Sequence, residues 1–289
     1  MNINATTKLA SLIGHPVSHS LSPDIHSFIS EKYNNNLAYL CFDVETENIG
    51  KALEGLKAIN FIGTNVTIPH KINVMEYLDE IDPNAKIIGA VNTVKNDNGK
   101  LIGYNTDGVG FCNSVLDAGF EIKGKKIMVL GAGGASRGVA VTLADYGASE
   151  IIIRNKTLSR AEIIANDINE HFPSCKASIG DMNITKEDID AVNILINTTP
   201  LGMSKDKDKC AIDTNIVPDN KNLVVCDIVF NPHETKLLKW AKDNGLGVVY
   251  GIGMLIGQAI ESYRIWTGID IKESTANEIY ESLKSNGRL

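Results

Sequence analysis

The stretch Leu130-Gly131-Ala132-Gly133-Gly134-Ala135-Ser136 stands between an apolar run over 126–130 and a helical pattern that continues to about residue 146. A glycine-rich turn between a strand and a helix lets the pyrophosphate of a dinucleotide approach backbone N–H groups at the helix N-terminus. Gly131 and Gly133 match the first two glycines of the dinucleotide-binding fingerprint, and Ser136 stands where a third glycine or alanine is usual. The pattern predicts a nucleotide site over 131–135, and a tight turn without a ligand is the alternative.

The end of the next predicted strand, 150–154, indicates which dinucleotide this turn would bind. An NAD site usually has an acidic residue there, about 20 residues after the first glycine, which binds the ribose hydroxyl. This sequence has Arg154-Asn155-Lys156-Thr157 instead, with Arg160 one turn further and no carboxylate. Because cations complement a 2′-phosphate, the pattern favours NADP. A solvated pair of Lys156 and Arg160 on a helix surface is the alternative.

Strand-like runs alternate with helical stretches along most of the chain, as is typical of βαβ units. The runs 191–196 and 223–228 are continuously apolar, which suits parallel strands covered on both faces. Earlier strands are predicted at 8–13, 38–44, 61–66 and 90–94. Asp97-Asn98-Gly99 has the composition of a hairpin turn and indicates an antiparallel strand at the end of this first sheet. We therefore predict an α/β protein, with a Rossmann-type doubly wound parallel sheet domain and a second α/β domain.

Composition excludes several classes of protein. The chain has 289 residues, 43% hydrophobic and 22% charged, which suits a globular protein of two domains. Its net charge of −7 argues against nucleic-acid or membrane partners. The sequence has no apolar run of the ~18 residues that a membrane helix needs and no leader-like N-terminus, so we expect a cytoplasmic protein. Neither the five cysteines nor the histidines show metal-ligand spacing, and no metal site is predicted.

Three polar stretches before residue 108 are candidates for a substrate site. Ser20 and Ser22 lie at a predicted helix start, where an anion is favoured, although Ser22 as a helix N-cap explains the pattern equally well. Lys71 lies just beyond a predicted strand, where α/β folds build sites, and an ordinary exposed lysine is the alternative. Asp107 precedes a helix, and helix capping alone would explain it.

Taken together, nine motifs resemble the shikimate dehydrogenase family in order and spacing, over essentially the whole chain. They are GHPVSHSLSPDIH (14–26), GTNVTIPHK (63–71), GAVNT (89–93), GYNTDG (103–108), GAGGASR (131–137), NKTLSR (155–160), NTTPLGM (197–203), CDIVFNP (226–232) and GIGMLIGQA (251–259). The resemblance implies NADPH-dependent reduction of 3-dehydroshikimate to shikimate, in the pathway to aromatic amino acids. It also implies a substrate-binding domain and a Rossmann domain, with the active site in the cleft between them.

By their positions in these motifs, Lys71 and Asp107 resemble the catalytic pair of the family. A ketone that accepts a hydride develops negative charge on its oxygen. A nearby ammonium group can stabilise that charge and supply the proton. A carboxylate close to the lysine would hold it in place and hydrogen-bond a substrate hydroxyl.

The same resemblance implies the binding residues. For the substrate they are Ser20, Ser22, Thr67, Lys71, Asn92, Asp107, Phe230 and Gln258. For NADP they are Gly131, Ala132, Gly133, Gly134, Ala135, Asn155, Lys156, Thr157, Arg160, Ile228, Gly251 and Met254. Phe230 replaces a usual tyrosine, which removes a hydroxyl contact to the substrate carboxylate. Lys156 replaces a usual arginine, and a point charge in place of a planar fork loosens the preference for NADP over NAD.

The motif order implies a discontinuous substrate-binding domain, 1–106 with 251–289, and an NADP-binding domain at 107–250. We expect an enzyme that acts on a small molecule as a monomer or homodimer. One alternative is a quinate/shikimate dehydrogenase that uses NAD or both cofactors. Another is a non-catalytic NADP-binding sensor, which would need neither Lys71 nor Asp107.

Overall fold

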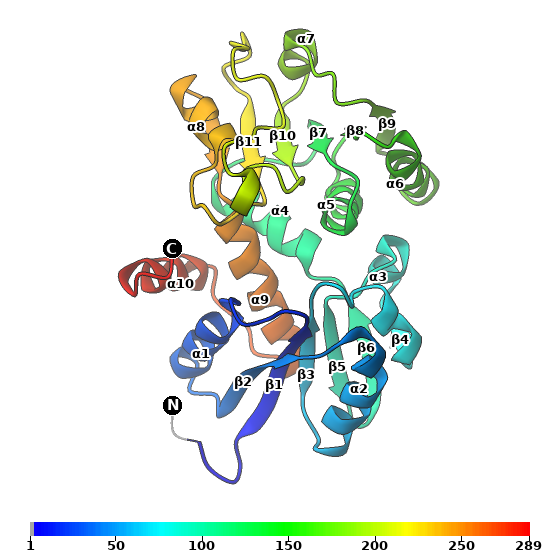
Figure 1. Ribbon diagram of the computed structural model, residues 1–289, viewed down its shortest axis with the longest axis vertical. Coiled ribbons are helices and arrows are strands. Elements are labelled where there is room, and N and C mark those ends of the chain that lie inside the picture. Colours follow the sequence, from blue (N-terminus) through cyan, green and yellow to red (C-terminus); the bar gives the residue numbers. More distant parts are fainter. Residues whose placement is uncertain (1–2) are drawn as a thin grey trace. The chain divides into compact units, whose positions relative to one another are not determined.

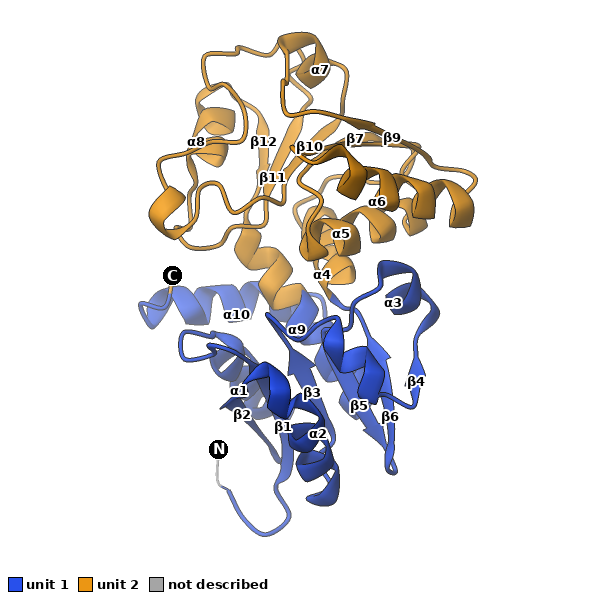
Figure 2. Ribbon diagram, turned by 45° about the vertical axis from the view of Figure 1, so that its right-hand side comes forward, with its two compact units in different colours: residues 1–106, 258–288 blue, residues 107–257, 289 orange. Residues whose placement is uncertain are grey.

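The computed structural model describes residues 3–289, and the chain divides into two compact units (Figures 1 and 2). Unit 1 comprises Met1–Thr106 and Gln258–Arg288, and unit 2 comprises Asp107–Gly257 with Leu289. The second division falls inside helix α9 (Gly251–Thr267), which begins in unit 2 and continues into unit 1. Residues 1 and 2, which the predicted substrate-binding domain includes, lie outside the described residues.

Within the described residues, the sheet of unit 1 has six strands in the order β2-β1-β3-β5-β6-β4 (Figure 1). They are β1 (Lys8–Gly14), β2 (Leu37–Asp43), β3 (Gly63–Val66), β4 (Glu80–Ile81), β5 (Thr93–Asp97) and β6 (Lys100–Tyr104). Asn98 and Gly99, with φ values of 53° and 93°, form the predicted tight turn between β5 and β6.

The predicted place of the antiparallel strand is wrong. β5 is antiparallel to both β3 and β6 and lies inside the sheet, not at its end. The reason is that β5 pairs with β3 on one side and with β6, across the tight turn, on the other, while β4 pairs in parallel with β6 and forms the edge.

The helices of unit 1 are formed by stretches with apolar residues at helical spacing. Besides the end of α9, they are α1 (Ser22–Lys32), α2 (Ile49–Ala58), α3 (Pro83–Ile88) and α10 (Ser274–Ser285). In α2 the residues Ile49, Leu53 and Leu56 recur on one side and are buried, in a core that includes Ile13 and Phe61. This core supports the strand ends that carry the polar residues described below.

The sheet of unit 2 is parallel throughout, with the described strands in the order β12-β11-β10-β7-β8-β9. They are β7 (Lys126–Leu130), β8 (Glu150–Arg154), β9 (Lys176–Gly180), β10 (Ile194–Asn197), β11 (Val224–Asp227) and β12 (Gly247–Val249). The chain moves outward from β7 in one direction through β8 and β9, and then from β10 in the other. The strand order therefore reverses between β7 and β10, where doubly wound folds bind their ligands.

The helices of unit 2 are connected to these strands as in a doubly wound domain. They are α4 (Asp107–Asp117), α5 (Gly134–Asp145), α6 (Leu158–His171), α7 (Lys186–Asp190), α8 (Lys236–Asp243) and the start of α9. The predicted fold class is confirmed, a doubly wound parallel sheet domain together with a second α/β domain. In the part of the chain that is described, no helix combines the length and the apolar character needed to cross a membrane.

Candidate functional site

The glycine-rich turn follows β7 and opens α5, at the point where the strand order reverses. Gly131 has a φ of 115°, and its backbone N–H donates to the carbonyl of Arg154 at 2.8 Å. A Cβ atom at this position would lie 2.7 Å from Oγ1 of Thr198. The turn therefore requires glycine at residue 131 for its conformation and for space.

Gly133 and Gly134 differ from Gly131, because a Cβ atom at either position would meet no atom within 4 Å. Gly133 is the N-cap of α5, and no side chain caps this helix start. Unpaired N–H groups at a helix N-terminus bind phosphate oxygens. The turn thus fits the pyrophosphate of a dinucleotide.

Ser136, which occupies the third glycine position of the fingerprint, has a structural role in this turn. It is fully buried, and its hydroxyl donates to the carbonyl of Gly131 at 2.6 Å. On the other side, the hydroxyl of Thr198 donates to the carbonyl of Leu130 at 2.7 Å. The two hydroxyls hold the turn from both sides, so serine at residue 136 is compatible with the fingerprint.

The cations after β8 do not all have the same surroundings. Arg154 forms an ion pair with Asp188 and lies 3.9 Å from Asp181. Its charge is therefore balanced by carboxylates of unit 2. Lys156 and Arg160 are exposed and form no ion pair with another described residue. They are the cations at this end of the sheet that can meet a phosphate group.

Asn155 organises the loop that carries Lys156. Its backbone N–H donates to the carbonyl of Gly180 at 3.0 Å, and its side chain donates to the carbonyl of Thr157 at 2.8 Å. The side-chain bond ties residues 155–157 into a compact turn before α6. Asn155 and Thr157 thereby fix the course of the backbone from which Lys156 extends.

Three predicted cofactor residues lie near the carboxyl end of β11. The backbone N–H of Ile228 donates to the carbonyl of Asn197 at 3.1 Å, which ties it to the end of β10. A Cβ atom on Gly251 would lie 2.5 Å from the carbonyl oxygen of Val229 and 2.6 Å from that of Ile228. Met254 is half-buried on α9, one turn beyond Gly251. Because glycine has no Cβ atom, the start of α9 can pack closely against the backbone of residues 228 and 229.

In unit 1, the predicted carboxylate-binding serines lie at the start of α1. The hydroxyl of Ser20 accepts a hydrogen bond from the N–H of Ser22 at 3.2 Å. The N-cap of α1 is Leu21, so the alternative that Ser22 caps the helix is wrong. The hydroxyl of Ser22 instead hydrogen-bonds Tyr39, and burial nevertheless raises the pKa of that phenol well above its usual value.

A network of buried amides and hydroxyls connects Tyr39 with the predicted substrate residue Asn92. The hydroxyl of Tyr39 donates to Oδ1 of Asn65 at 2.8 Å. Nδ2 of Asn65 donates to Oγ1 of Thr93 at 3.1 Å and to Oγ of Ser262 at 2.9 Å. Oγ1 of Thr93 donates to Oδ1 of Asn92 at 3.0 Å. Four elements of unit 1 thus share one polar network.

Gln258 and Thr67 border this network. Gln258 is 9% exposed on α9, and its carbonyl accepts the hydroxyl of Ser262 at 2.8 Å. The backbone N–H of Thr67 donates to the carbonyl of Ile13 at 3.0 Å, which continues the pairing of β3 with β1. Gln258 therefore lies one turn before Ser262 of the network, and Thr67 lies directly after β3.

Lys71 lies in the loop after β3 and is half-buried. The carbonyl of Lys71 accepts the N–H of Val91 at 2.8 Å, and the buried ring of His70 contacts the carbonyl of Val44 at 2.6 Å. These contacts fix the backbone on both sides of the loop. Asp107, the other predicted catalytic residue, is the first residue of α4 in unit 2 and is 8% exposed.

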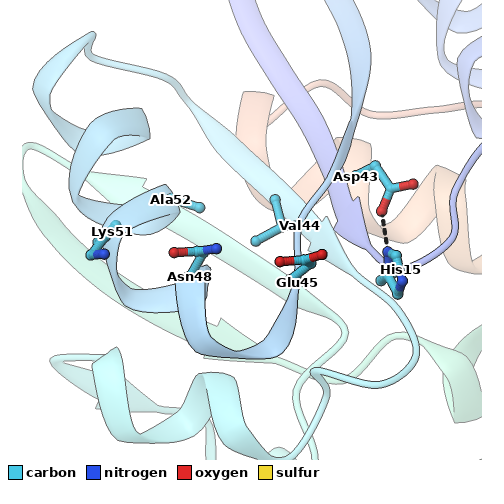
Figure 3. Close-up of a pocket in the computed structure, with 7 residues that line it drawn as sticks. All are labelled: His15, Asp43, Val44, Glu45, Asn48, Lys51 and Ala52. Carbon is cyan, nitrogen blue, oxygen red and sulfur yellow. Dashed lines mark hydrogen bonds and ion pairs between the residues drawn. The ribbon is translucent and has the colours of Figure 1, made fainter.

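Figure 3 shows a surface pocket of unit 1 whose lining includes none of the predicted site residues. Its lining includes His15, Asp43, Glu45 and Lys51. The hydrogen bond that the His15 ring donates to the Asp43 carboxylate raises the pKa of His15. No group of three or more His, Cys, Asp or Glu side chains among residues 3–289 is arranged to hold a metal ion.

Sequence reasoning missed several polar residues of unit 1. They are Tyr39, Asn65, Thr93, Thr106 and Ser262. Asn65 and Thr93 gave a usable signal, because polar side chains inside short apolar strands need buried partners. The sequence around Tyr39 and Ser262 carried no such signal.

Three family models match the chain. They describe a shikimate dehydrogenase substrate binding domain over residues 12–94, a shikimate / quinate 5-dehydrogenase over 114–228, and a shikimate 5′-dehydrogenase C-terminal domain over 251–276. A shikimate dehydrogenase (NADP⁺) of Methanococcus aeolicus is 47% identical over 268 residues, which cover 92% of this chain and 94% of that protein.

Two solved structures are similar over nearly the whole chain. The shikimate 5-dehydrogenase of Listeria monocytogenes in complex with shikimate and NAD has a TM-score of 0.91 at 33% identity, covering 97% of this chain and 98% of that one. The enzyme of Thermus thermophilus in complex with NADP(H) and shikimate has a TM-score of 0.84 at 32% identity, covering 96% and 99%.

Proposed function

The chain belongs to the shikimate dehydrogenase family, and we propose that it reduces 3-dehydroshikimate to shikimate with NADPH through a catalytic pair of Lys71 and Asp107. It is an NADP-dependent oxidoreductase. The observation that carries the proposal is the match of all three family models in order, combined with a glycine turn that fits a dinucleotide.

Lys71 is proposed to be the acid that donates a proton to the substrate oxygen. NADPH supplies the hydride that adds to the ketone carbon of the substrate, and negative charge then develops on the ketone oxygen. The ammonium of Lys71 stabilises this charge and donates its proton to the oxygen, which completes the alcohol. The backbone contacts at His70 and Lys71 support this role, because a proton donor needs a fixed position.

Asp107 is proposed to bind a substrate hydroxyl and to hold Lys71. A carboxylate accepts hydrogen bonds only, so it suits both an ammonium and an alcohol as partners. The strong burial of Asp107 supports the proposal, since buried carboxylates require such partners.

Substrate binding is proposed for the polar residues of unit 1, Ser20, Ser22, Thr67, Asn92 and Gln258. The serines would bind the carboxylate through hydroxyl donors, and the others would bind ring hydroxyls. The buried network around Asn65 and Asn92 supports this assignment, because it fixes the directions of the amides before a ligand arrives. Phe230 is half-buried and offers only an apolar contact.

Cofactor binding is proposed for unit 2. Residues 131–135 would bind the pyrophosphate, Lys156 and Arg160 the 2′-phosphate, and Ile228, Gly251 and Met254 the nicotinamide end. The exposure of Lys156 and Arg160 supports the second assignment. We further infer that the enzyme works in the cytoplasm as a monomer or homodimer, without nucleic-acid or membrane partners, and the net charge of −7 supports the inference about partners.

The test is an assay of the purified protein with shikimate and NADP⁺, followed by the absorbance of NADPH. An increase that depends on shikimate is expected, and no increase would contradict the proposed reaction. A quinate/shikimate dehydrogenase that uses NAD is the second candidate, favoured by Lys156 at a usual arginine position. Offering quinate and NAD⁺ in the same assay separates the two.

A further inference from the structure

Asp227 is a buried carboxylate at the carboxyl end of β11 that none of the proposed catalytic or binding steps uses. Its Oδ1 accepts hydrogen bonds from the N–H of Val229 at 3.0 Å and from Nδ2 of Asn197 at 2.9 Å. Its Oδ2 accepts the hydroxyl of Thr235 at 2.7 Å. One side chain therefore joins the segment after β11, the end of β10 and the start of α8.

Two of these partners, Asn197 and Thr235, make further contacts. Asn197 also binds the loop after β10, through Leu201 at 3.1 Å and the hydroxyl of Thr199 at 2.6 Å. The hydroxyl of Thr235 accepts the N–H of Leu238 at 3.3 Å and caps α8. The carboxylate of Asp227 thus accepts hydrogen bonds from three segments at the carboxyl ends of β10 and β11.

The backbone that Asp227 holds is the backbone assigned to the cofactor. The N–H of Ile228 is bound by the carbonyl of Asn197, and the next N–H, of Val229, is bound by Asp227. The carbonyls of Ile228 and Val229 lie against Gly251 with no space for a methyl group. A shift of this peptide would therefore move both Ile228 and Gly251.

We propose that Asp227 is a positioning residue, which in its carboxylate form fixes the backbone of residues 228 and 229 for hydride transfer at the nicotinamide end of the cofactor. This inference rests on the proposed function of unit 2. Asp227 itself touches neither substrate nor cofactor in this proposal, and it acts through Ile228 and Gly251.

The charge of Asp227 matters because all three of its partners are donors. A proton added to the carboxyl group takes up one acceptor position, so at least one of these hydrogen bonds must reverse its direction or break. Burial raises the pKa of Asp227 to about 6, although its hydrogen bonds with Thr235, Val229 and Asn197 each lower it. Acidification to about pH 6 should therefore loosen this part of the site while the fold persists.

Few charged groups come from the elements around Asp227. β11 contributes Cys226, and burial raises the pKa of that thiol. The loop before β11 contributes Cys210, whose thiol pKa is also raised by burial. The segment from β11 to α8 contributes His233, Glu234 and Lys236, β12 is followed by Tyr250, and β10 contributes no titratable side chain. Of these, only His233 ordinarily titrates near pH 6, so the test must separate it from Asp227.

The experiment compares the wild type with Asp227→Asn, which has the shape of the protonated acid, and with Asp190→Asn as a control. Asp190 is also a hydrogen-bonded carboxylate, but it lies at the end of α7, before β10. The pH profile of kcat is measured with NADP⁺ and again with NAD⁺, because a phosphate group also titrates near pH 6.

For the wild type we expect kcat to fall below about pH 6 with either cofactor. This decline is the acid limb of the pH profile. For Asp227→Asn we expect kcat at about pH 8 to be about tenfold lower, the acid limb to be absent, and KM for shikimate to change less than about twofold. Asp190→Asn should behave like the wild type. An acid limb that persists in Asp227→Asn, or an unchanged kcat, overturns the inference.

A second pair of variants keeps Asp227 itself in place and covers the case in which Asp227→Asn fails to fold. Thr235→Val removes one hydrogen bond that lowers the pKa of Asp227, whereas Thr235→Ser keeps it. The midpoint of the acid limb should move to higher pH in Thr235→Val only. Equal midpoints in both variants overturn the inference, whereas a wild type that does not oxidise shikimate at any pH contradicts the proposed function instead.

Discussion

The backbone N–H of Thr106 donates to Oδ1 of Asn92 at 2.8 Å, while Nδ2 of Asn92 donates to Oγ1 of Thr106 at 3.0 Å. A backbone N–H can only donate, so this contact determines which end of the Asn92 amide is oxygen. The oxygen also accepts the hydroxyl of Thr93 at 3.0 Å. The amide therefore presents its NH₂ group as a hydrogen-bond donor, which suits a substrate oxygen as its partner.

Asn92→Asp should for this reason be strongly impaired. The carboxylate replaces the donor with an acceptor and adds a negative charge next to an anionic substrate. We expect kcat/KM for shikimate to fall about 100-fold, with NADP⁺ affinity unchanged. Asn98→Asp, at the exposed hairpin turn, adds the same charge to unit 1 and should retain activity. Equal losses in both variants would show that the added charge alone is responsible.

Lys71→Ala should lose kcat and keep substrate binding. The proposed proton donor acts in the transition state, so its removal should lower kcat about 1,000-fold while the dissociation constant of shikimate stays within about threefold. Steady-state kinetics and direct titration with shikimate measure the two quantities. Lys86→Ala, which removes an exposed lysine on α3, is the control. A raised KM at unchanged kcat would mean that Lys71 only binds the substrate.

Lys156→Ala and Arg160→Ala should each weaken the preference for NADP⁺. Both side chains are exposed at the end of β8 without an ion pair to another described residue. We expect each change to lower kcat/KM for NADP⁺ about tenfold and to leave the value for NAD⁺ within about twofold. Lys239→Ala, an exposed position on α8, is the control. A parallel loss with NAD⁺ would contradict a role at the 2′-phosphate.

Gly131→Ala and Gly134→Ala should fail in different ways. At residue 131 a methyl group lies 2.7 Å from Oγ1 of Thr198 and φ is 115°, so we expect a stability loss of about 1–3 kcal/mol. At residue 134 the methyl group meets no protein atom within 4 Å, so the melting temperature should hold while NADP⁺ affinity falls. A lower melting temperature in Gly134→Ala would show that this position is constrained by packing.

The fold of unit 2 could be predicted well where the signal was local. The strands at 126–130 and 150–154 and the glycine turn between them were predicted from consecutive residues. β9 and β12, the two edge strands, were not predicted, because β9 contains polar residues and β12 has only three residues. The place of β5 inside the first sheet depends on its pairing with β3, which is distant in sequence, and the edge strand β4 has only two residues and no detectable pattern.

The proposed site of unit 1 and its hydrogen-bond network were predictable only in part. Ser20, Ser22 and Asn92 lie in short motifs, so the resemblance to a family identified them. The hydrogen bond between Asn65 and Ser262 joins residues 197 positions apart, and no local pattern contains such a pair. Asp227 lies in a motif that was recognised, yet its role depends on contacts with Asn197 and Thr235 that appear only in the folded chain.

The pKa of Asp227 also predicts how stability depends on pH. Because burial raises it from 3.8 to about 6, the folded protein binds a proton between these values that the unfolded chain releases. Unfolding free energy should then fall as pH rises through this range, by about 3 kcal/mol for this group.

Asp227→Asn removes the ionisable group and with it this pH-dependent loss of stability. Relative to the wild type, the variant should therefore gain stability between about pH 4 and about pH 8. Asp190, whose pKa is lowered first by its hydrogen bond from Asn220, should give the opposite sign in Asp190→Asn. Urea unfolding at both pH values measures this, and a constant difference between Asp227→Asn and the wild type would contradict it.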